Sequence, residues 1–372
     1  MSKGLKALEE KVFNENFCAV CGACLSLCPY LRSWKGRVVK LDDCTLEEGR
    51  CFAYCPRTEM ELDEVHRGIF GKNYEEIEVG PVRKILMARA KDPIFHQKAQ
   101  TGGVVSALID FAFQEKMIEA GVLTPRNGDL LPQGQIVKNR KEILRCAGSS
   151  YVSGPTLEAF NRGPWKGEER IGIVGLPCQV LAMARMKISK LDKKTPIDRV
   201  VLVIGLFCTW ALDYKPFMSL LHERVGGHSI KKLNITPPPE RILEVTAGNK
   251  LYRIPVDDLR SFIRPSCRVC LDMTAELADI SVGTVEGKEG WNTVIIRTAV
   301  GEDLLKRAQR EGIVETRLLP EDHLRHLKQA SLLKKRRALE AIDGKGGIEK
   351  AYVRLSTDLI QRILSESKGI KT

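Results

Sequence analysis

The chain has 372 residues, of which 43% are hydrophobic and 28% charged, a composition that is ordinary for a soluble globular protein of two or three domains. Its formal net charge is +12 at pH 7, and it contains 12 cysteines. The charged residues 1–11 lack the apolar core of a signal peptide, which argues against a secreted protein held by disulfides. We therefore expect a cytoplasmic protein whose cysteines bind metal.

Hydrophobicity and charge also limit the partners. Residues 200–212 form the longest apolar run, about 13 residues against the roughly 20 that span a bilayer, so no transmembrane segment is expected. Positive charge attracts nucleic acid, anionic lipid, an acidic protein or an anionic coenzyme alike. The basic run Lys334-Lys335-Arg336-Arg337 lies in helix-like sequence without interleaved aromatic residues. We interpret it as a solvated helix face and expect no nucleic-acid partner.

The cysteines near the N-terminus have the spacing of a bacterial ferredoxin. The pattern consists of Cys18, Cys21, Cys24, Cys28 and Pro29. In this pattern the first three thiolates hold one 4Fe-4S cluster and the fourth reaches a second cluster. A zinc site is the alternative interpretation. The spacing predicts that residues 1–80 form a small ferredoxin-like α+β module with its connector.

A second cluster site in this module is less regular. By resemblance to two-cluster ferredoxins, Cys55 completes the first cluster, which leaves Cys28, Cys44 and Cys51 for the second. One thiolate is missing. The acidic candidates for a fourth ligand are Asp42, Asp43, Glu47 and Glu48. A three-iron cluster and an empty structural remnant are the other interpretations, so the occupant of this site is open.

The next segment, residues 81–165, begins with a predicted strand at 84–90 and a helix over 102–118. Gln100, Thr101, Gly102, Gly103 and Val104 lie where this helix begins. Glycines allow close backbone approach, and the free N–H groups of a helix start suit an anion such as a dinucleotide pyrophosphate. On these residues alone, an ordinary helix start is the simpler interpretation. Further on, Cys146 is either an incidental buried thiol or the missing ligand of the irregular cluster.

Residues 166–320 alternate strands and helices, which predicts an α/β fold. A strand at 170–175 ends before Cys178, and a strand at 199–207 ends before Cys208. A thiolate at such a turn suits either nucleophilic or ligand chemistry. Cys267 and Cys270 form a C-x-x-C pair that can chelate one metal centre, so we expect all four thiolates to meet in one place.

The remaining elements complete the expected architecture. A hairpin is predicted at 241–255, a helix at 255–263, and two strands at 279–285 and 294–298 that flank a loop. Residues 321–372 are expected to form a helical tail. Neither a G-x-G-x-x-G motif nor a P-loop is present, so the sequence does not support nicotinamide binding by a Rossmann unit or ATP chemistry.

Five segments together resemble the beta-subunit family of coenzyme F420 hydrogenases and dehydrogenases. They are residues 100–105, residues 147–151, residues 177–179, the cysteine pair at 267–270, and Gly290-Trp291. The resemblance covers most of residues 81–320 and implies an iron–sulfur flavoprotein. It implies a cluster at the four cysteines named above and FAD contacts at Gln100, Thr101, Gly102, Gly103, Val104, Gly148, Ser149, Ser150, Tyr151, Ser153, Gly290 and Trp291. A packed aromatic beside a turn is the alternative interpretation of Trp291.

This resemblance implies an electron path. Reduced coenzyme F420 would give a hydride to FAD, and electrons would then pass through the clusters to a partner complex such as a formate dehydrogenase, a hydrogenase or a heterodisulfide-reductase-like protein. The reverse direction is equally compatible. Many family members carry Lys where this chain has Ser150, so NAD(P)H, ferredoxin or a pigment stays an alternative donor. An electron-relay subunit without a soluble substrate is the non-enzymatic alternative.

Overall fold

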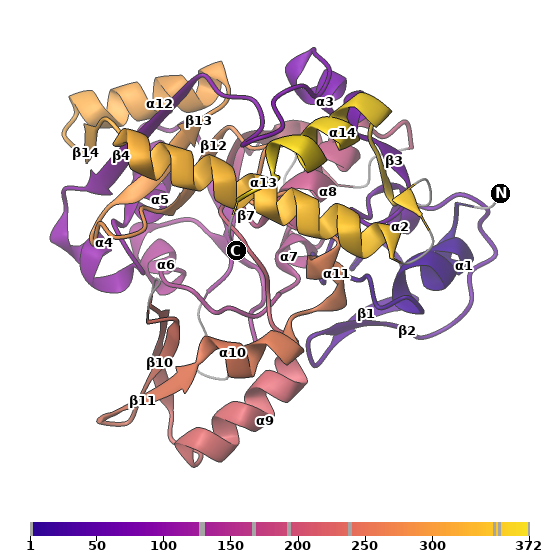
Figure 1. Ribbon diagram of the computed structural model, residues 1–372, viewed down its shortest axis with the longest axis horizontal. Helices are drawn as coiled ribbons and strands as arrows, with labels where there is room; N and C mark the ends of the chain where they lie inside the picture. Colours follow the sequence, from indigo (N-terminus) through magenta and orange to yellow (C-terminus); the bar gives the residue numbers. More distant parts are fainter. Residues whose placement is uncertain are drawn as a thin grey trace.

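A mixed eight-stranded sheet forms the centre of the molecule. The computed structural model describes residues 3–125, 131–165, 169–191, 195–236, 240–344, 347–348 and 351–370. The strand order is β14-β4-β13-β12-β8-β7-β5-β6 (Figure 1). The strands are β4 (Lys84–Ala90), β5 (Ala120–Leu123), β6 (Gln135–Val137), β7 (Ile171–Gly175), β8 (Val200–Leu206), β12 (Ile280–Thr284), β13 (Asn292–Ile296) and β14 (Val314–Arg317). The four inner strands β5, β7, β8 and β12 pair in parallel, and antiparallel strands flank them on both sides.

The inner strands are buried on both faces. Ile173 of β7 and Val203 of β8 face one hydrophobic core, whereas Val174 and Ile204 face the other, as the two-residue period of a strand requires. A strand buried on both faces is a continuous apolar run, and for this reason the sequence predicts both strands correctly.

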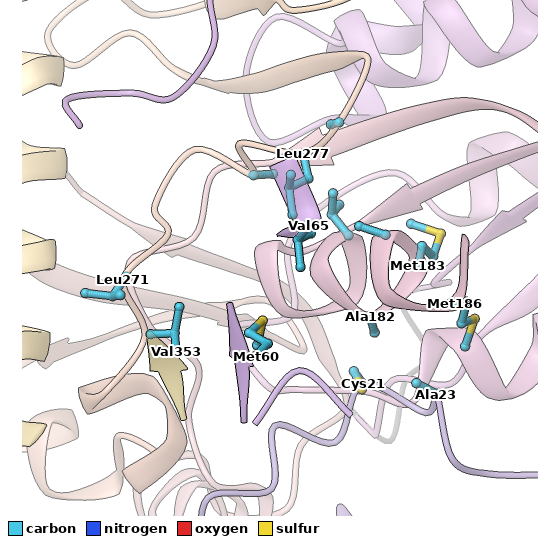
Figure 2. Close-up of a cluster of buried hydrophobic side chains, with 14 of the residues drawn as sticks. Cys21, Ala23, Met60, Val65, Ala182, Met183, Met186, Leu271, Leu277 and Val353 are labelled. Atoms are coloured by element: carbon cyan, nitrogen blue, oxygen red, sulfur yellow. The ribbon is translucent and has the colours of Figure 1, made fainter. Parts of the chain in front are cut away.

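Helices cover both faces of this sheet. The helices α5 (Val104–Gln114) and α12 (Ala299–Arg310) pack on one face. The other face carries α3 (Leu62–Phe70), α8 (Pro177–Ile188), α13 (Glu321–Asp343) and α14 (Thr357–Glu366). Figure 2 shows this second core, in which Val65 and Leu277 lie near Met183. Shorter helices are α4 (Pro93–Lys98), α6 (Arg140–Arg145), α7 (Thr156–Asn161) and α11 (Pro265–Arg268). The predicted α/β fold with a helical C-terminal part is confirmed.

A small lobe extends from the sheet at the bottom of Figure 1. It consists of α9 (Tyr214–Val225), β9 (Ile230–Ile235), β10 (Ile242–Ala247), β11 (Lys250–Pro255) and α10 (Val256–Leu259). Its three strands are antiparallel in the order β11-β10-β9 and pack on α9 through Leu221, Leu233 and Val245. The sequence predicts the β10–β11 hairpin but not β9, whose consecutive lysines interrupt the apolar pattern.

The N-terminal module has a small core of its own. It comprises α1 (Leu5–Leu8), a π-helical turn (Glu9–Phe13), β1 (Leu31–Trp34), β2 (Arg37–Lys40) and α2 (Arg50–Ala53). Leu8, Leu25 and Phe52 are buried among the cysteines of this module. Beyond it, β3 (Met60–Glu61) pairs in parallel with β15 (Val353–Arg354) near the C-terminus. Across the described ranges, no helix combines the length and apolarity needed to cross a membrane.

Arg297, directly after β13, ties four segments together inside the protein. Its guanidinium donates to Ser281 Oγ at 2.8 Å, to the carbonyls of Val79 and Pro81 at 2.8 Å each, and to Thr274 O at 3.1 Å. The side chain is buried. Removing it leaves several buried acceptors without donors, and each such loss costs about 1–3 kcal/mol.

We therefore expect Arg297→Met to lower the free energy of unfolding by about 3 kcal/mol or more. The measurement is urea unfolding followed by circular dichroism. Arg310→Met, on the exposed end of α12, serves as the control and should change this free energy by less than about 0.5 kcal/mol. Equal effects of the two substitutions would contradict the assigned role of Arg297.

Candidate functional site

Four cysteines from three segments surround one pocket. Cys178 opens α8, Cys208 follows β8, and Cys267 and Cys270 lie in and directly after α11. All four line a pocket of about 20 Å³. The structure thus brings the four cysteines together, and their role as metal ligands stays a prediction.

The sheet explains why Cys178 and Cys208 meet. The strands β7 and β8 are parallel neighbours with Gly175 opposite Gly205, so their carboxyl ends lie at the same edge. Gln179 fixes the turn after β7. Its Oε1 accepts from Leu176 N at 2.7 Å, and its Nε2 donates to Thr156 Oγ1 at 2.8 Å. This role of Gln179 was not predicted from the sequence, although Gln179 directly follows Cys178.

The C-x-x-C pair reaches the same edge through short backbone bonds. Cys267 N donates to Arg264 O at 2.9 Å, and Cys208 N donates to Met273 O at 2.8 Å. The Sγ of Cys267 accepts from Ala211 N at 3.3 Å. The loops that carry Cys208 and Cys267 are therefore bonded to each other and to the residues that follow Cys270.

Positive charge surrounds this pocket. Burial raises the pKa of Cys178 to about 12, although Arg57 opposes the shift. Burial also raises the pKa of Cys270, but Lys334 and Arg57 outweigh it, and the net shift is downward. Four thiolates at one place repel one another, so holding all four ionised requires a positively charged centre.

Two further groups of cysteines lie in the N-terminal module. Burial is the main cause that raises the pKa of Cys24, followed by the thiolates of Cys18, Cys21 and Cys55 and then by that of Cys51, so these side chains are neighbours. Burial and then the thiolates of Cys28 and Cys44 raise the pKa of Cys51 to about 12. The seven cysteines of the module therefore lie close together, and their division into two cluster sites stays a prediction.

Two candidates for the missing ligand of the second site, Asp43 and Cys146, have other surroundings, and the fourth ligand stays open. Asp43 is exposed and pairs with Lys40 Nζ at 2.8 Å. Cys146 packs against the core that contains Leu108 and Ile143, not against the core of the N-terminal module. Burial raises its pKa to about 12. These contacts favour an incidental, partly buried thiol for Cys146.

The N-terminal module lies directly against the four-cysteine pocket. Ala19 and Arg57 form part of the pocket wall. Arg57 donates to Ser266 O at 3.3 Å, and Arg264 donates to Cys18 O at 3.1 Å. Cys178 is among the thiolates that raise the pKa of Cys21, after burial as the main cause. Figure 2 shows Cys21 beside Ala182 and Met186 of α8, inside the main core.

No group of three or more His, Cys, Asp or Glu side chains in the described ranges is close enough to hold a single metal ion. The four cysteines instead stand around a pocket. This arrangement suits a multi-iron cluster, in which each iron binds its own thiolate. The residues present therefore fit an iron–sulfur cluster, and the buried cations around them fit its negative charge.

The predicted FAD segment before α5 packs tightly against the sheet. Asn292 Nδ2 donates to Thr101 Oγ1 at 2.6 Å, and Asn292 Oδ1 accepts from Val104 N at 3.4 Å. A Cβ on Gly102 would lie 2.7 Å from Asn292 Oδ1 and 2.9 Å from Gly290 O. Glycine is required at 102 by packing inside the protein. Sequence reasoning missed Asn292, which directly follows Trp291.

The predicted segment with Gly148, Ser149 and Ser150 meets the first one at β9. Gln100 Nε2 donates to Asn234 Oδ1, and Tyr151 Oη accepts from Ile235 N at 3.0 Å. Ser150 Oγ donates to Val152 O at 3.3 Å. Ser153 is buried and lines the four-cysteine pocket. The structure therefore brings the two segments together through β9, and their contact with a flavin stays a prediction.

Trp291 is packed between two guanidinium groups. The Cζ atoms of Arg89 and Arg317 lie 4.7 and 4.9 Å from its ring centroid. Both arginines also bind Glu315. Trp291 is only 8% exposed. These contacts are those of a packed aromatic beside a turn, and its contact with a flavin stays a prediction.

The interpretation of the basic run as a solvated helix face is wrong for two of its four members. Lys334 and Lys335 are 5% and 1% exposed, whereas Arg337 is exposed. Lys335 forms an ion pair with the buried Glu276. The helix α13 lies against the four-cysteine site, so one face of this polar sequence turns inward. Burial of long side chains with specific partners cannot be read from a local charge pattern.

Two models of one protein family match this chain. They describe the beta subunit of coenzyme F420 hydrogenase/dehydrogenase: the model of its N-terminal part matches residues 85–161, and the model of its C-terminal part matches residues 168–322. The chain belongs to this family. Because its relatives are hydrogenase, dehydrogenase and sulfite reductase proteins, it is an oxidoreductase.

Individual relatives agree with the family assignment. The beta subunit of the coenzyme F420 hydrogenase of Methanosarcina barkeri is 29% identical over 72% of this chain and 94% of that protein. A subunit of the F(420)H(2) dehydrogenase of Methanosarcina mazei is 28% identical over 78% of this chain and 82% of that protein. A solved chain of the F420-reducing NiFe hydrogenase complex from Methanosarcina barkeri matches with a TM-score of 0.66 and 27% identity, over 75% of this chain and 98% of that chain.

A second cavity lies between the cysteine site and the C-terminal helices of this family member. It has a volume of about 50 Å³, room for about three water molecules, and is lined by Cys178, Cys270, His66 and Asp272 among others. His66 is 1% exposed, and its Nδ1 has no hydrogen-bond partner within the described part of the chain. Burial lowers the pKa of His66 to about 4.

This shift predicts a pH dependence of stability. Because the pKa of His66 lies below its ordinary value of 6.5, the unfolded chain takes up a proton first, and stability is lost as the pH falls from 6.5 toward 4. When the pH is lowered from 7.5 to 5.5, the free energy of unfolding of the wild type should fall by about 1 kcal/mol more than that of His66→Phe. Urea unfolding at each pH measures this, with the exposed His228→Phe as the control. An identical loss in wild type and His66→Phe would argue against a buried neutral His66.

Proposed function

We propose that this chain is the iron–sulfur flavoprotein subunit that moves electrons between coenzyme F420 and the iron–sulfur clusters of a partner complex. The named relatives are subunits of coenzyme F420 hydrogenase and F(420)H(2) dehydrogenase, and these names support the coenzyme. One observation carries the proposal: the four-cysteine pocket shares a wall with a module of ferredoxin spacing. Two electron-carrying sites in contact are what a relay requires.

The cysteines would hold the clusters in three groups. Cys178, Cys208, Cys267 and Cys270 would hold a 4Fe-4S cluster in the family domain. Cys18, Cys21, Cys24 and Cys55 would hold a second one, and Cys28, Cys44 and Cys51 an incomplete third. The mutual proximity of the thiols within each group supports this assignment. The third group lies in the N-terminal module and is partly buried, so it would be the group from which a partner accepts electrons.

The FAD site would be formed by residues 100–104, 148–153 and 290–291. Bound FAD supplies the conversion between a two-electron hydride donor and one-electron clusters. The hydrogen bond between Thr101 and Asn292 fixes the loop before α5. Gln100 and Tyr151 each form a hydrogen bond to β9, which holds their two segments side by side. Ser153 lines the cysteine pocket, so the segment that carries it would adjoin both the flavin site and the cluster site. No side chain is required as a proton donor, because these residues bind and orient the groups.

Arg57 would lie on the path between the two cluster sites. It lines the pocket with Cys178 and Cys270, and it stands two residues after Cys55. Its bonds to Ser266 O and Tyr352 Oη hold the module against the family domain and against the C-terminal part of the chain. Electrons could travel in either direction along this path, depending on the potentials of coenzyme and partner. A hydrogenase, a formate dehydrogenase or a heterodisulfide-reductase-like protein would serve as the partner.

An anaerobic titration tests the choice of coenzyme. The iron-reconstituted, FAD-loaded protein is mixed with reduced F420 or, in parallel, with NADH, and the bleaching of flavin and cluster absorbance is followed. We expect rapid bleaching by reduced F420 alone. Bleaching by NADH alone would contradict the proposal and would make Ser150 the first residue to examine. Ser150→Lys then serves as the matched variant, because it restores the residue that many family members carry.

A cysteine substitution tests the cluster assignment. Cys267→Ala should remove about four iron atoms per chain, leave FAD bound, and abolish electron transfer to an added one-electron acceptor. Iron and flavin analysis and acceptor reduction measure these effects. Cys146→Ala, which removes a partly buried thiol outside the three groups, should change none of these three quantities. Normal acceptor reduction by Cys267→Ala would refute the proposed exit route.

A further inference from the structure

Lys334 brings a positive charge into the four-cysteine pocket. It lies on α13, is 5% exposed and lines the pocket together with the four cysteines. Its Nζ donates to Cys208 O at 2.6 Å and to Asp272 O at 2.7 Å. The ammonium group is therefore held by two of the loops that carry the cysteines.

The charge of Lys334 has no carboxylate of its own within the described part of the chain. The neighbouring Lys335 is paired with Glu276, but Lys334 has only carbonyl oxygens as partners. Burying an ammonium group without an anion is strongly unfavourable. Burial lowers the pKa of Lys334, but the neighbouring Cys270, Cys208 and Cys267, followed by Asp272, outweigh it and the net shift is upward, so these are the nearby groups that can carry negative charge. This arrangement is stable when the pocket holds an anionic centre.

An iron–sulfur cluster held by four thiolates is such a centre. Its net charge is negative and becomes more negative by one when it takes up an electron. A fixed cation at short range therefore stabilises the reduced state more than the oxidised state, which raises the reduction potential. Low solvent exposure strengthens this effect, because water cannot screen the charge.

We propose that Lys334 sets the reduction potential of the cluster bound by Cys178, Cys208, Cys267 and Cys270. This inference rests on the proposed function. Lys334 would act on the cluster through its positive charge and would not bind iron. Arg57 also lines the pocket, as a second cation. Both cations lie outside the matched residues 85–161 and 168–322, whereas the four cysteines lie inside them. The potential is thus adjusted by segments that flank the family domains.

Substitutions that separate charge from hydrogen bonding test this inference. Lys334→Gln keeps an N–H donor for the two carbonyls and loses the charge, whereas Lys334→Arg keeps the charge. Arg337→Gln, on the exposed face of the same helix, is the control. Each reconstituted full-length protein is titrated anaerobically with dithionite. The reduction potential of the cluster is measured from its electron paramagnetic resonance signal. The signal of this cluster is identified in the wild type as the one that Cys267→Ala removes.

We expect Lys334→Gln to lower the one-electron reduction constant of this cluster about tenfold, a shift of about 59 mV. In Lys334→Arg and Arg337→Gln, this reduction constant should stay within about threefold of the wild-type value. Loss of the cluster from Lys334→Gln but not from Lys334→Arg would also support the inference. An unchanged potential in Lys334→Gln, equal shifts in both variants, or loss of the cluster from Lys334→Arg would overturn it.

The same data separate this inference from the proposed function. If Cys267→Ala removes no cluster signal, the assignment of the cluster itself fails. If it removes the signal and Lys334→Gln keeps the wild-type potential, only the role of Lys334 fails.

Discussion

The parallel pairing of β7 with β8 is the constraint on which the cysteine site depends. Parallel neighbours end at the same edge of a sheet, so the turns that follow them carry Cys178 and Cys208 to one place. The strand β12 pairs in parallel with β8, and the segment before it returns Cys267 and Cys270 to that edge. Crevices at the carboxyl ends of parallel strands are common ligand sites in α/β proteins for this reason.

Buried positive charge is the second theme of the molecule. Arg57, Arg264 and Lys334 converge on the cysteine loops from the N-terminal module, from the family domain and from α13. Each is satisfied mainly by backbone carbonyls of those loops. These contacts hold the loops in place and leave net positive charge beside the thiols, an arrangement that favours ionised thiolates and an electron-accepting centre.

The N-terminal module is integrated with the domain that follows it. Asn161 Nδ2 donates to the carbonyls of Gly22, Ala23 and Leu25, and Arg185 donates to the carbonyls of Ala53 and Thr58. Cys21 itself belongs to the main core. The contact between module and domain is therefore built from the backbone of the cysteine loops, which these hydrogen bonds hold against the domain.

The sequence by itself determined the α/β class, the strands β7, β8 and β12, and the meeting of Cys178 and Cys208 with the C-x-x-C pair. Strands buried on both faces leave long apolar runs, and ferredoxin spacing and the C-x-x-C pair are local patterns. Only the tertiary structure decided that β9 joins the segments of Gln100 and Tyr151, that Asn292 anchors Thr101, and that Lys334 and Lys335 turn inward. The physical reason is that a charged or amide side chain is buried only when partners distant in sequence satisfy it, and a local pattern carries no record of those partners.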